Sequence, residues 1–168
     1  ILEATSVWHC LESVRLLQKI PLQYRIDVSI LICHIFYITA FYLDFRSAPE
    51  LDKKGARIAI AICSIFGMGF YLYIRANLGP LRIPVMAYTF VISFMMMMAA
   101  FRNQRVNTLS FNLILVGAMF FVLSDALLAI NKFSQAFNHA HLFIMVTYMA
   151  AQYLITIGAI ERKLISTQ

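Results

Sequence analysis

Long apolar runs separated by short polar stretches dominate the chain after residue 27. A helix rises about 1.5 Å per residue and needs roughly 20 apolar residues to cross a bilayer. Inside lipid the backbone must satisfy its own hydrogen bonds, which leaves a helix as the structure for such runs. The pattern therefore predicts five transmembrane helices, over Val28–Leu43, Ile58–Ile74, Ile83–Phe101, Thr108–Ile130 and His141–Ile160.

The residues before the first run follow a different pattern, because charged side chains such as Glu12 and Arg15 interrupt them. Apolar positions at helical spacing remain there, so an amphipathic helix along the membrane surface is one interpretation. The chain begins with Ile rather than Met, and a truncated segment is the other interpretation. We therefore divide the chain into an interfacial or truncated segment (1–27), a transmembrane helical domain (28–160) and a short polar tail (161–168).

The composition requires that the apolar excess face lipid. Hydrophobic residues make up 61% of the chain and charged residues 13%, whereas soluble domains carry about 25% charged residues. A soluble protein of this size cannot bury so much apolar surface in one core. The fold class expected is an all-α integral membrane protein, a bundle of about five transmembrane helices with membrane lipids around it.

The net charge of +6 comes from basic residues in the short loops. Such residues set topology, so we expect no nucleic-acid partner. The loops on the side of the C-terminal tail hold eight Lys or Arg, and those on the other side hold six, which favours a cytoplasmic C-terminus. The expected location is an endomembrane such as the endoplasmic reticulum in a eukaryote, or the inner membrane in a bacterium.

Asp125 is the acidic residue that lies within an apolar run. An ionisable group inside a membrane helix is costly, which makes it a candidate functional residue; a structural hydrogen bond to a neighbouring helix is the alternative. Counted at about 1.5 Å per residue from one side of the membrane, His34, Tyr88, Asp125 and Tyr148 all lie about 8 to 10 Å deep. This common depth predicts that they line one pocket, with Tyr37 and Gln152 a turn deeper.

His139 and His141 form an His-x-His pair beside this layer. Such a pair can bind zinc, but the chain offers no matching acidic or cysteine motif. Two interfacial histidines at a helix start are the preferred interpretation, and we expect no metal or redox cofactor.

Four segments together resemble the signature of the YhhN-like lysoplasmalogenase family, from about Val28 to Gly158. The Ser-Asp and Tyr-xxx-Gln elements carry most of the likeness. The segments are Cys33–Tyr37, Pro84–Tyr88, Gly117–Ala129, and Thr147–Ile155 with Gly158.

The resemblance implies an ether hydrolase that cleaves the vinyl ether bond of a lysophospholipid, giving a fatty aldehyde and a glycerophospho-base. Asp125 is then the candidate acid, with His34 as the alternative acid or the activator of water. The expected substrate-binding residues are Tyr37, Tyr88, Ser124, Tyr148 and Gln152. A basic side chain on the same side of the membrane, Arg75, Arg82 or Lys132, would hold the phosphate.

Family members have about eight spans and an additional Gly-Asp motif upstream of the histidine motif. Residues 1–27 contain no Gly-Asp, so we expect a chain that lacks the N-terminal spans or that acidic residue. Two other functions stay open. One is a zinc-dependent ceramidase-like lipid hydrolase that uses His34, Asp125, His139 and His141. The other is a non-catalytic lipid-binding or transport protein.

Overall fold

The computed structural model describes residues 22–47 and 53–164, and in these ranges the chain consists of helices. The interfacial segment expected before residue 22 lies outside the described residues. Five long helices are apolar enough to cross a membrane, which confirms the predicted fold class. They are α2 (Leu22–Ser47), α3 (Lys53–Ile74), α4 (Arg82–Ala100), α5 (Thr108–Phe133) and α6 (Ala140–Ile160), with short 3-10 helices η1 (Arg75–Asn77) and η2 (Gly79–Leu81) between α3 and α4.

The helices are longer than the apolar runs that predicted them. α2 begins at Leu22 and ends at Ser47, whereas the sequence predicted Val28–Leu43. α3 begins at Lys53 rather than Ile58, and α5 ends at Phe133 rather than Ile130. Polar residues can continue a helix into the headgroup region, where they cost little, so the apolar run marks the lipid-buried part alone.

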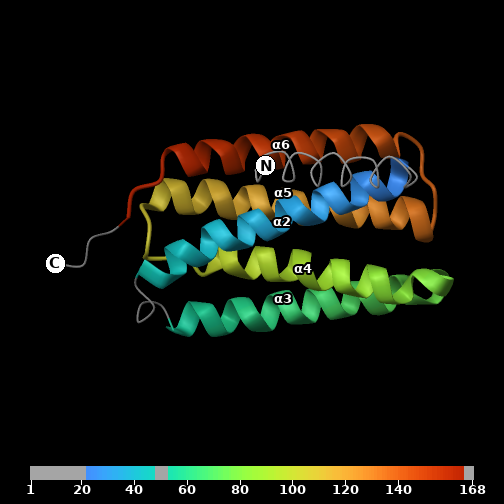
Figure 1. Ribbon diagram of the computed structural model, residues 1–168, viewed down its shortest axis with the longest axis horizontal. Helices are drawn as coiled ribbons and strands as arrows, with labels where there is room; N and C mark the ends of the chain where they lie inside the picture. Colours follow the sequence, from blue (N-terminus) through green and yellow to red (C-terminus); the bar gives the residue numbers. More distant parts are fainter. Residues whose placement is uncertain (1–21, 48–52, 165–168) are drawn as a thin grey trace, which may run out of the picture.

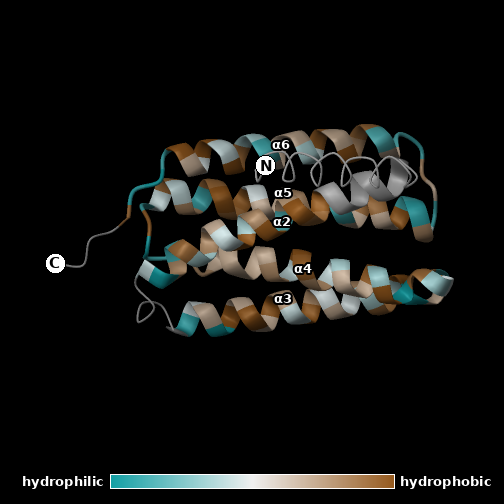
Figure 2. Cartoon of the chain, viewed as in Figure 1, coloured by the Kyte–Doolittle hydropathy of each residue, from teal (hydrophilic) through white to brown (hydrophobic). Residues whose placement is uncertain are grey.

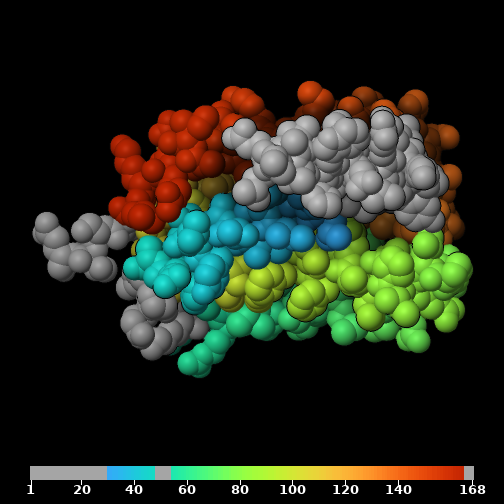
Figure 3. Space-filling model, in the orientation of Figure 1, coloured from blue at the N-terminus to red at the C-terminus, as the bar shows by residue number. Residues whose placement is uncertain are grey.

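Four helices form an antiparallel row in the order α6, α5, α4, α3, and α2 crosses this row obliquely (Figure 1). α2 packs mainly on α4, and the space-filling view shows it covering the middle of one face (Figure 3). We name the two ends of the bundle by their residues. The Arg102 end holds the α4–α5 turn and the end of α6; the Lys132 end holds η1, η2 and the α5–α6 turn.

The outer surface of the bundle is apolar along most of its length. Large side chains such as Ile65, Phe90 and Tyr153 are more than half exposed, and hydrophilic residues gather toward the ends of the helices (Figure 2). Such a surface is unfavourable in water and favourable against lipid chains. The chain is therefore an integral membrane protein that spans the bilayer several times.

Glycines let α5 and α6 pack closely. A Cβ atom on Gly117 would lie 2.8 Å from Ile155 Cγ1, and one on Gly158 would lie 2.6 Å from Ile114 Cγ1 and 3.1 Å from the Ile114 backbone nitrogen. Small residues at facing positions are the usual means of close helix packing in lipid, where no hydrophobic effect draws helices together. This seam fixes the face of α5 that turns toward the other helices.

We expect Gly158→Ala to destabilise the bundle by about 1 to 3 kcal/mol, because the new methyl group overpacks the seam. Gly69→Ala is the matched control, since a Cβ atom on Gly69 of α3 meets nothing within 4 Å. Thermal unfolding in one detergent checks both variants. A melting temperature of Gly158→Ala equal to that of Gly69→Ala would contradict the close packing.

Candidate active site

Asp125 lies in the wall of a cavity of about 500 Å³ lined mainly by α3, α4 and α5. Buried positions recur along α5 every three or four residues, through Gly117 and Phe121 to Asp125. The helical period that builds the core thus also turns this carboxyl group inward. Asp125 is 9% exposed, and the other lining residues are mostly apolar, among them Phe70, Val91 and Leu128. A carboxyl group in such a place needs a partner within the protein.

His34 of α2 is that partner. Its Nε2 atom lies 3.5 Å from Asp125 Oδ2, and the histidine is fully buried. On the other side of the ring, Nδ1 lies 2.7 Å from the backbone oxygen of Ile30. A carbonyl oxygen only accepts hydrogen bonds, so Nδ1 carries a hydrogen and donates it.

This assignment limits how the two groups can form a hydrogen bond. With Nδ1 protonated, the Nε2 atom of a neutral imidazole presents a lone pair to Asp125. A hydrogen bond between Nε2 and the facing oxygen would need a protonated carboxyl beside neutral His34, or a carboxylate beside protonated His34. In either form the hydrogen bond would contain one proton, which is the arrangement that a general acid or base can use.

The facing atoms of this pair are not hydrogen-bonded to each other. Neither His34 Nε2 nor Asp125 Oδ2 makes a hydrogen bond of good geometry within the described residues, although both are buried. Buried polar atoms are nearly always paired, and the exceptions gather at functional sites. Their 3.5 Å separation is an ion-pair distance rather than a formed hydrogen bond,. The pair is therefore a candidate functional group rather than an ordinary buried hydrogen bond.

Aromatic rings surround the imidazole. The Phe121 ring packs edge-on against His34 at 4.7 Å between centroids, and the Tyr88 ring at 6.0 Å. Tyr88 also lines the cavity and interacts with the Asp125 carboxyl group. The structure thus brings His34, Tyr88 and Asp125 together from three different helices, but only Tyr88 and Asp125 belong to the described cavity wall.

Tyr148 and Gln152 lie on the other side of Phe121. The Tyr37 hydroxyl donates to Gln152 Oε1 at 2.7 Å, and Gln152 Nε2 donates to the Tyr148 hydroxyl at 3.2 Å. Phe121 also packs against these residues, since the centroid of its ring lies 5.4 Å from that of Tyr148 and 6.2 Å from that of Tyr37. These two hydrogen bonds link α2 to α6, and the three residues that form them are not part of the cavity wall. Their expected substrate-binding role stays a prediction.

Ser124 also faces α6 rather than the cavity. It is buried, and its hydroxyl donates to the backbone oxygen of Ile144 at 3.1 Å. The serine of the Ser-Asp element thus joins α5 to α6, and Asp125, one residue later, faces the cavity. Its expected contact with substrate likewise stays a prediction.

A second charged cluster, which sequence reasoning missed, lies at the Arg102 end. Arg102 is fully buried, and its Nε donates to Asp44 Oδ2 at 2.7 Å while an Nη donates to the Ser110 hydroxyl at 3.0 Å. Arg162, past the end of α6, pairs with the other oxygen of Asp44. Burial lowers the pKa of Arg102 from its ordinary value, and the hydrogen bond to Asp44 opposes this effect.

The sequence held no signal for this cluster. Asp44 follows the last residue of the first predicted run, and Arg102 lies in a predicted loop, which is where charged residues of membrane proteins are usually solvated. The two are 58 positions apart in the chain. Packing of the α4–α5 turn under the end of α2 brings them together, and this packing cannot be derived from local patterns.

The four residues considered for zinc do not form a site. His139 and His141 are exposed at the start of α6. Within residues 22–47 and 53–164, no three His, Cys, Asp or Glu side chains gather where one ion would contact all of them. The donor set that a zinc-dependent hydrolase needs is thus not assembled from these ranges.

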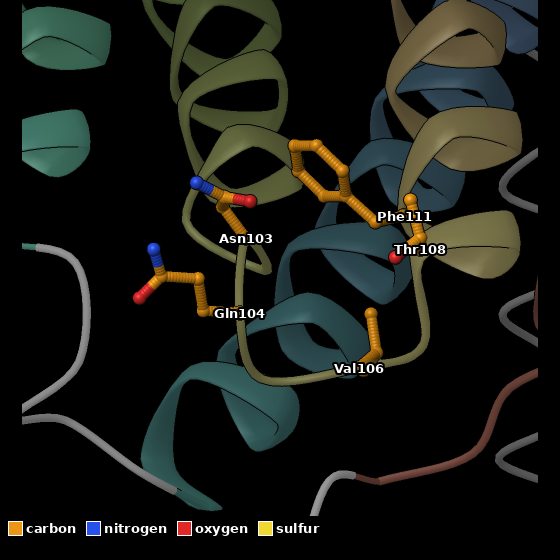
Figure 4. Close-up of a pocket in the computed structure, with 5 residues that line it drawn as sticks. All are labelled: Asn103, Gln104, Val106, Thr108 and Phe111. Carbon is orange, nitrogen blue, oxygen red and sulfur yellow. The ribbon is translucent and has the colours of Figure 1, made fainter.

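A smaller hollow of about 240 Å³ lies at the α4–α5 turn, far from Asp125 (Figure 4). Its wall consists of Asn103, Gln104, Val106, Thr108 and Phe111. None of these side chains is acidic or basic, so the hollow offers no catalytic group, and the 500 Å³ cavity is the candidate active site.

Comparison with known proteins finds relatives that are lysoplasmalogenases. Human (Homo sapiens) lysoplasmalogenase TMEM86A is 28% identical over 138 residues, which are 79% of this chain and 53% of that protein. Human lysoplasmalogenase TMEM86B is 56% identical over 45 residues, covering 27% of this chain and 20% of that protein. Its counterpart in pig (Sus scrofa) is 51% identical over 42 residues, which are 25% of this chain and 19% of that protein. The chain thus spans about half the length of TMEM86A, and no solved structure matches it.

The model of the YhhN family matches residues 28–159, a range that runs from α2 to the end of α6. It includes the four helices that place His34, Tyr88, Asp125 and Tyr148. This range is most of the chain, and the chain therefore belongs to the YhhN family.

Proposed function

We propose that the chain forms the catalytic site of a lysoplasmalogenase. The reaction adds water across a vinyl ether bond of a lysoplasmalogen and yields a fatty aldehyde and a glycerophospho-base. The observation that carries the proposal is the buried pair of His34 and Asp125, of which Asp125 lies in the wall of an apolar cavity. Membership of the YhhN family and the lysoplasmalogenases among its relatives support the same reaction class.

The chemistry requires such a pair. A vinyl ether hydrolyses when a proton is transferred to its outer alkene carbon, which leaves an oxocarbenium ion on the carbon bonded to oxygen. Water adds to that carbon and loses a proton, and the hemiacetal then collapses to the aldehyde and the free glycerol hydroxyl. The enzyme must hold an acid close to a carbon atom and then a negative charge close to a cation.

Asp125 supplies both functions in turn. In the protonated form its carboxyl gives the proton to carbon, and the resulting carboxylate stabilises the oxocarbenium ion beside it. His34 accepts or returns the proton through Nε2 as water adds, so the pair ends the cycle with the proton count it began with. Tyr88, which also interacts with the Asp125 carboxyl, orients that group or the incoming water.

Release of a fatty aldehyde from a 1-alkenyl lysophospholipid by the purified chain tests the proposal. The matched substrate is the 1-alkyl lysophospholipid, whose saturated ether has no alkene carbon to protonate, and we expect no product from it. Ceramide is a second control, because the zinc-dependent alternative predicts its hydrolysis. Binding of the alkenyl lipid without any aldehyde release would overturn the proposal in favour of the lipid-binding alternative.

A further inference from the structure

Two charged side chains belong to the described wall of the 500 Å³ cavity, and both come from α5. One is Asp125, and the other is Lys132 at the Lys132 end. Arg75 and Arg82 lie at the same end but are exposed outside the wall. The sequence offered Arg75, Arg82 and Lys132 equally as the residue that binds phosphate, and of these three Lys132 lines the cavity.

Asp125 and Lys132 are spaced to act on one ligand. Seven residues make almost two helical turns, so the two side chains share a face of α5 and their Cα atoms are about 10 Å apart along the axis. Lys132 lies near the end of α5, where a long side chain reaches the polar headgroup region. Its Nζ atom lies 5.5 Å from the ring of Phe133, which also lines the cavity.

The cavity-lining residues of α5 between Asp125 and Lys132 include two with small side chains. Ala129 follows Asp125 by one turn and precedes Lys132 by three residues, and Ala126 lies beside it in the same wall. Methyl side chains leave space there for a ligand to lie along the helix. In a lysoplasmalogen, seven bonds separate phosphorus from the outer alkene carbon, a span of about 8 Å at ordinary bond geometry. That span fits between an acid and an ammonium group placed two turns apart.

We propose that Lys132 binds the phosphate of the lysolipid and selects phosphate-bearing lipids over neutral ether lipids, with the glycerol lying over Ala129. The ammonium group is a flexible point charge of the kind that binds phosphate oxygens. This arrangement sets the alkene carbon at the depth of Asp125, and the hydrocarbon chain continues past Val122 and Ser93 toward the middle of the bilayer. The lipid's identity rests on the proposed function, whereas the phosphate contact is open to a test without turnover.

The experiment measures binding of two lipids that cannot react, 1-O-alkyl-glycerophosphocholine and 1-O-alkylglycerol, to the purified chain in one detergent. We expect Lys132→Gln to weaken binding of the phosphate lipid about tenfold, the usual effect of a lost hydrogen bond to a charged group, and to leave binding of alkylglycerol unchanged. Lys132→Arg keeps most of the affinity, and raised salt weakens binding by the wild type but not by Lys132→Gln.

Arg82→Gln is the matched control, because it removes a basic residue of the same end that lies outside the cavity wall. Ala129→Leu is expected to weaken binding of both lipids, because it fills the space of the glycerol. Equal affinity of Lys132→Gln and wild type for the phosphate lipid, or an equal loss for both lipids, would overturn the inference. Because neither lipid is hydrolysed, these results are independent of whether the chain turns over a lysoplasmalogen.

Discussion

Asp125→Asn is expected to lower turnover of a lysoplasmalogen at least about a hundredfold, because a general acid contributes about 10² to 10⁴ in rate. The amide keeps the size of the carboxyl and its capacity for hydrogen bonds, but it cannot transfer a proton to carbon. It also cannot become the carboxylate that stabilises the oxocarbenium ion. Aldehyde release, normalised to folded protein, is the measurement.

Two variants outside the cavity wall provide the comparison. Tyr148→Phe and Gln152→Ala disturb the hydrogen-bonded chain between α2 and α6, which lies across Phe121 from the His34–Asp125 pair. We expect smaller losses from both, because they remove no proton donor that faces the cavity. Near-wild-type turnover by Asp125→Asn would show that His34 or a residue elsewhere in the protein is the acid.

The depth argument placed neighbouring residues at one level because the rise of a helix is nearly constant. Counting residues from the membrane surface fixes how deep a side chain lies, and His34, Tyr88 and Asp125 do meet at one level. The same count does not give the direction in which a side chain points around its helix. Tyr148 shares the depth, but its rotation on α6 turns it toward Tyr37 and Gln152 rather than into the cavity.

The spans followed from the sequence because lipid imposes a strict condition on backbone hydrogen bonds. The ends of the helices could not be predicted in this way, since the helices continue through polar residues such as Lys53 and Arg46. The charged residues at the ends were interpreted through topology alone. That interpretation hid the pairing of Asp44 with Arg102, which depends on how a turn packs beneath a helix.

Asp44→Asn is expected to lower the free energy of unfolding by about 3 to 5 kcal/mol, the range for removal of one partner from a buried ion pair. Arg102 would keep its charge without a carboxylate, while fully buried and above the ring of Phe41. About 1 kcal/mol corresponds to 2 to 4 °C in a protein of this size, so the melting temperature is expected to fall by about 6 °C or more. Thermal unfolding in a fixed detergent measures this.

Arg162→Gln is the control for this site, because Arg162 pairs with the same carboxylate while 39% exposed. An exposed partner contributes about 0 to 1 kcal/mol, so we expect a small change. If Asp44→Asn were no less stable than Arg162→Gln, the buried pair would not stabilise the fold.

The double variant Asp44→Leu, Arg102→Met separates burial of a charge from loss of packing. Replacing a buried pair by apolar side chains is often neutral or stabilising, so the double variant should be more stable than Asp44→Asn although it changes more atoms. Asp44 lies ten residues from His34 on α2, about 15 Å along the axis. Folded Asp44→Asn protein should therefore keep its turnover, whereas Asp125→Asn should lose turnover per folded molecule. Loss of turnover per folded molecule in Asp44→Asn would show that the two ends of the bundle are coupled.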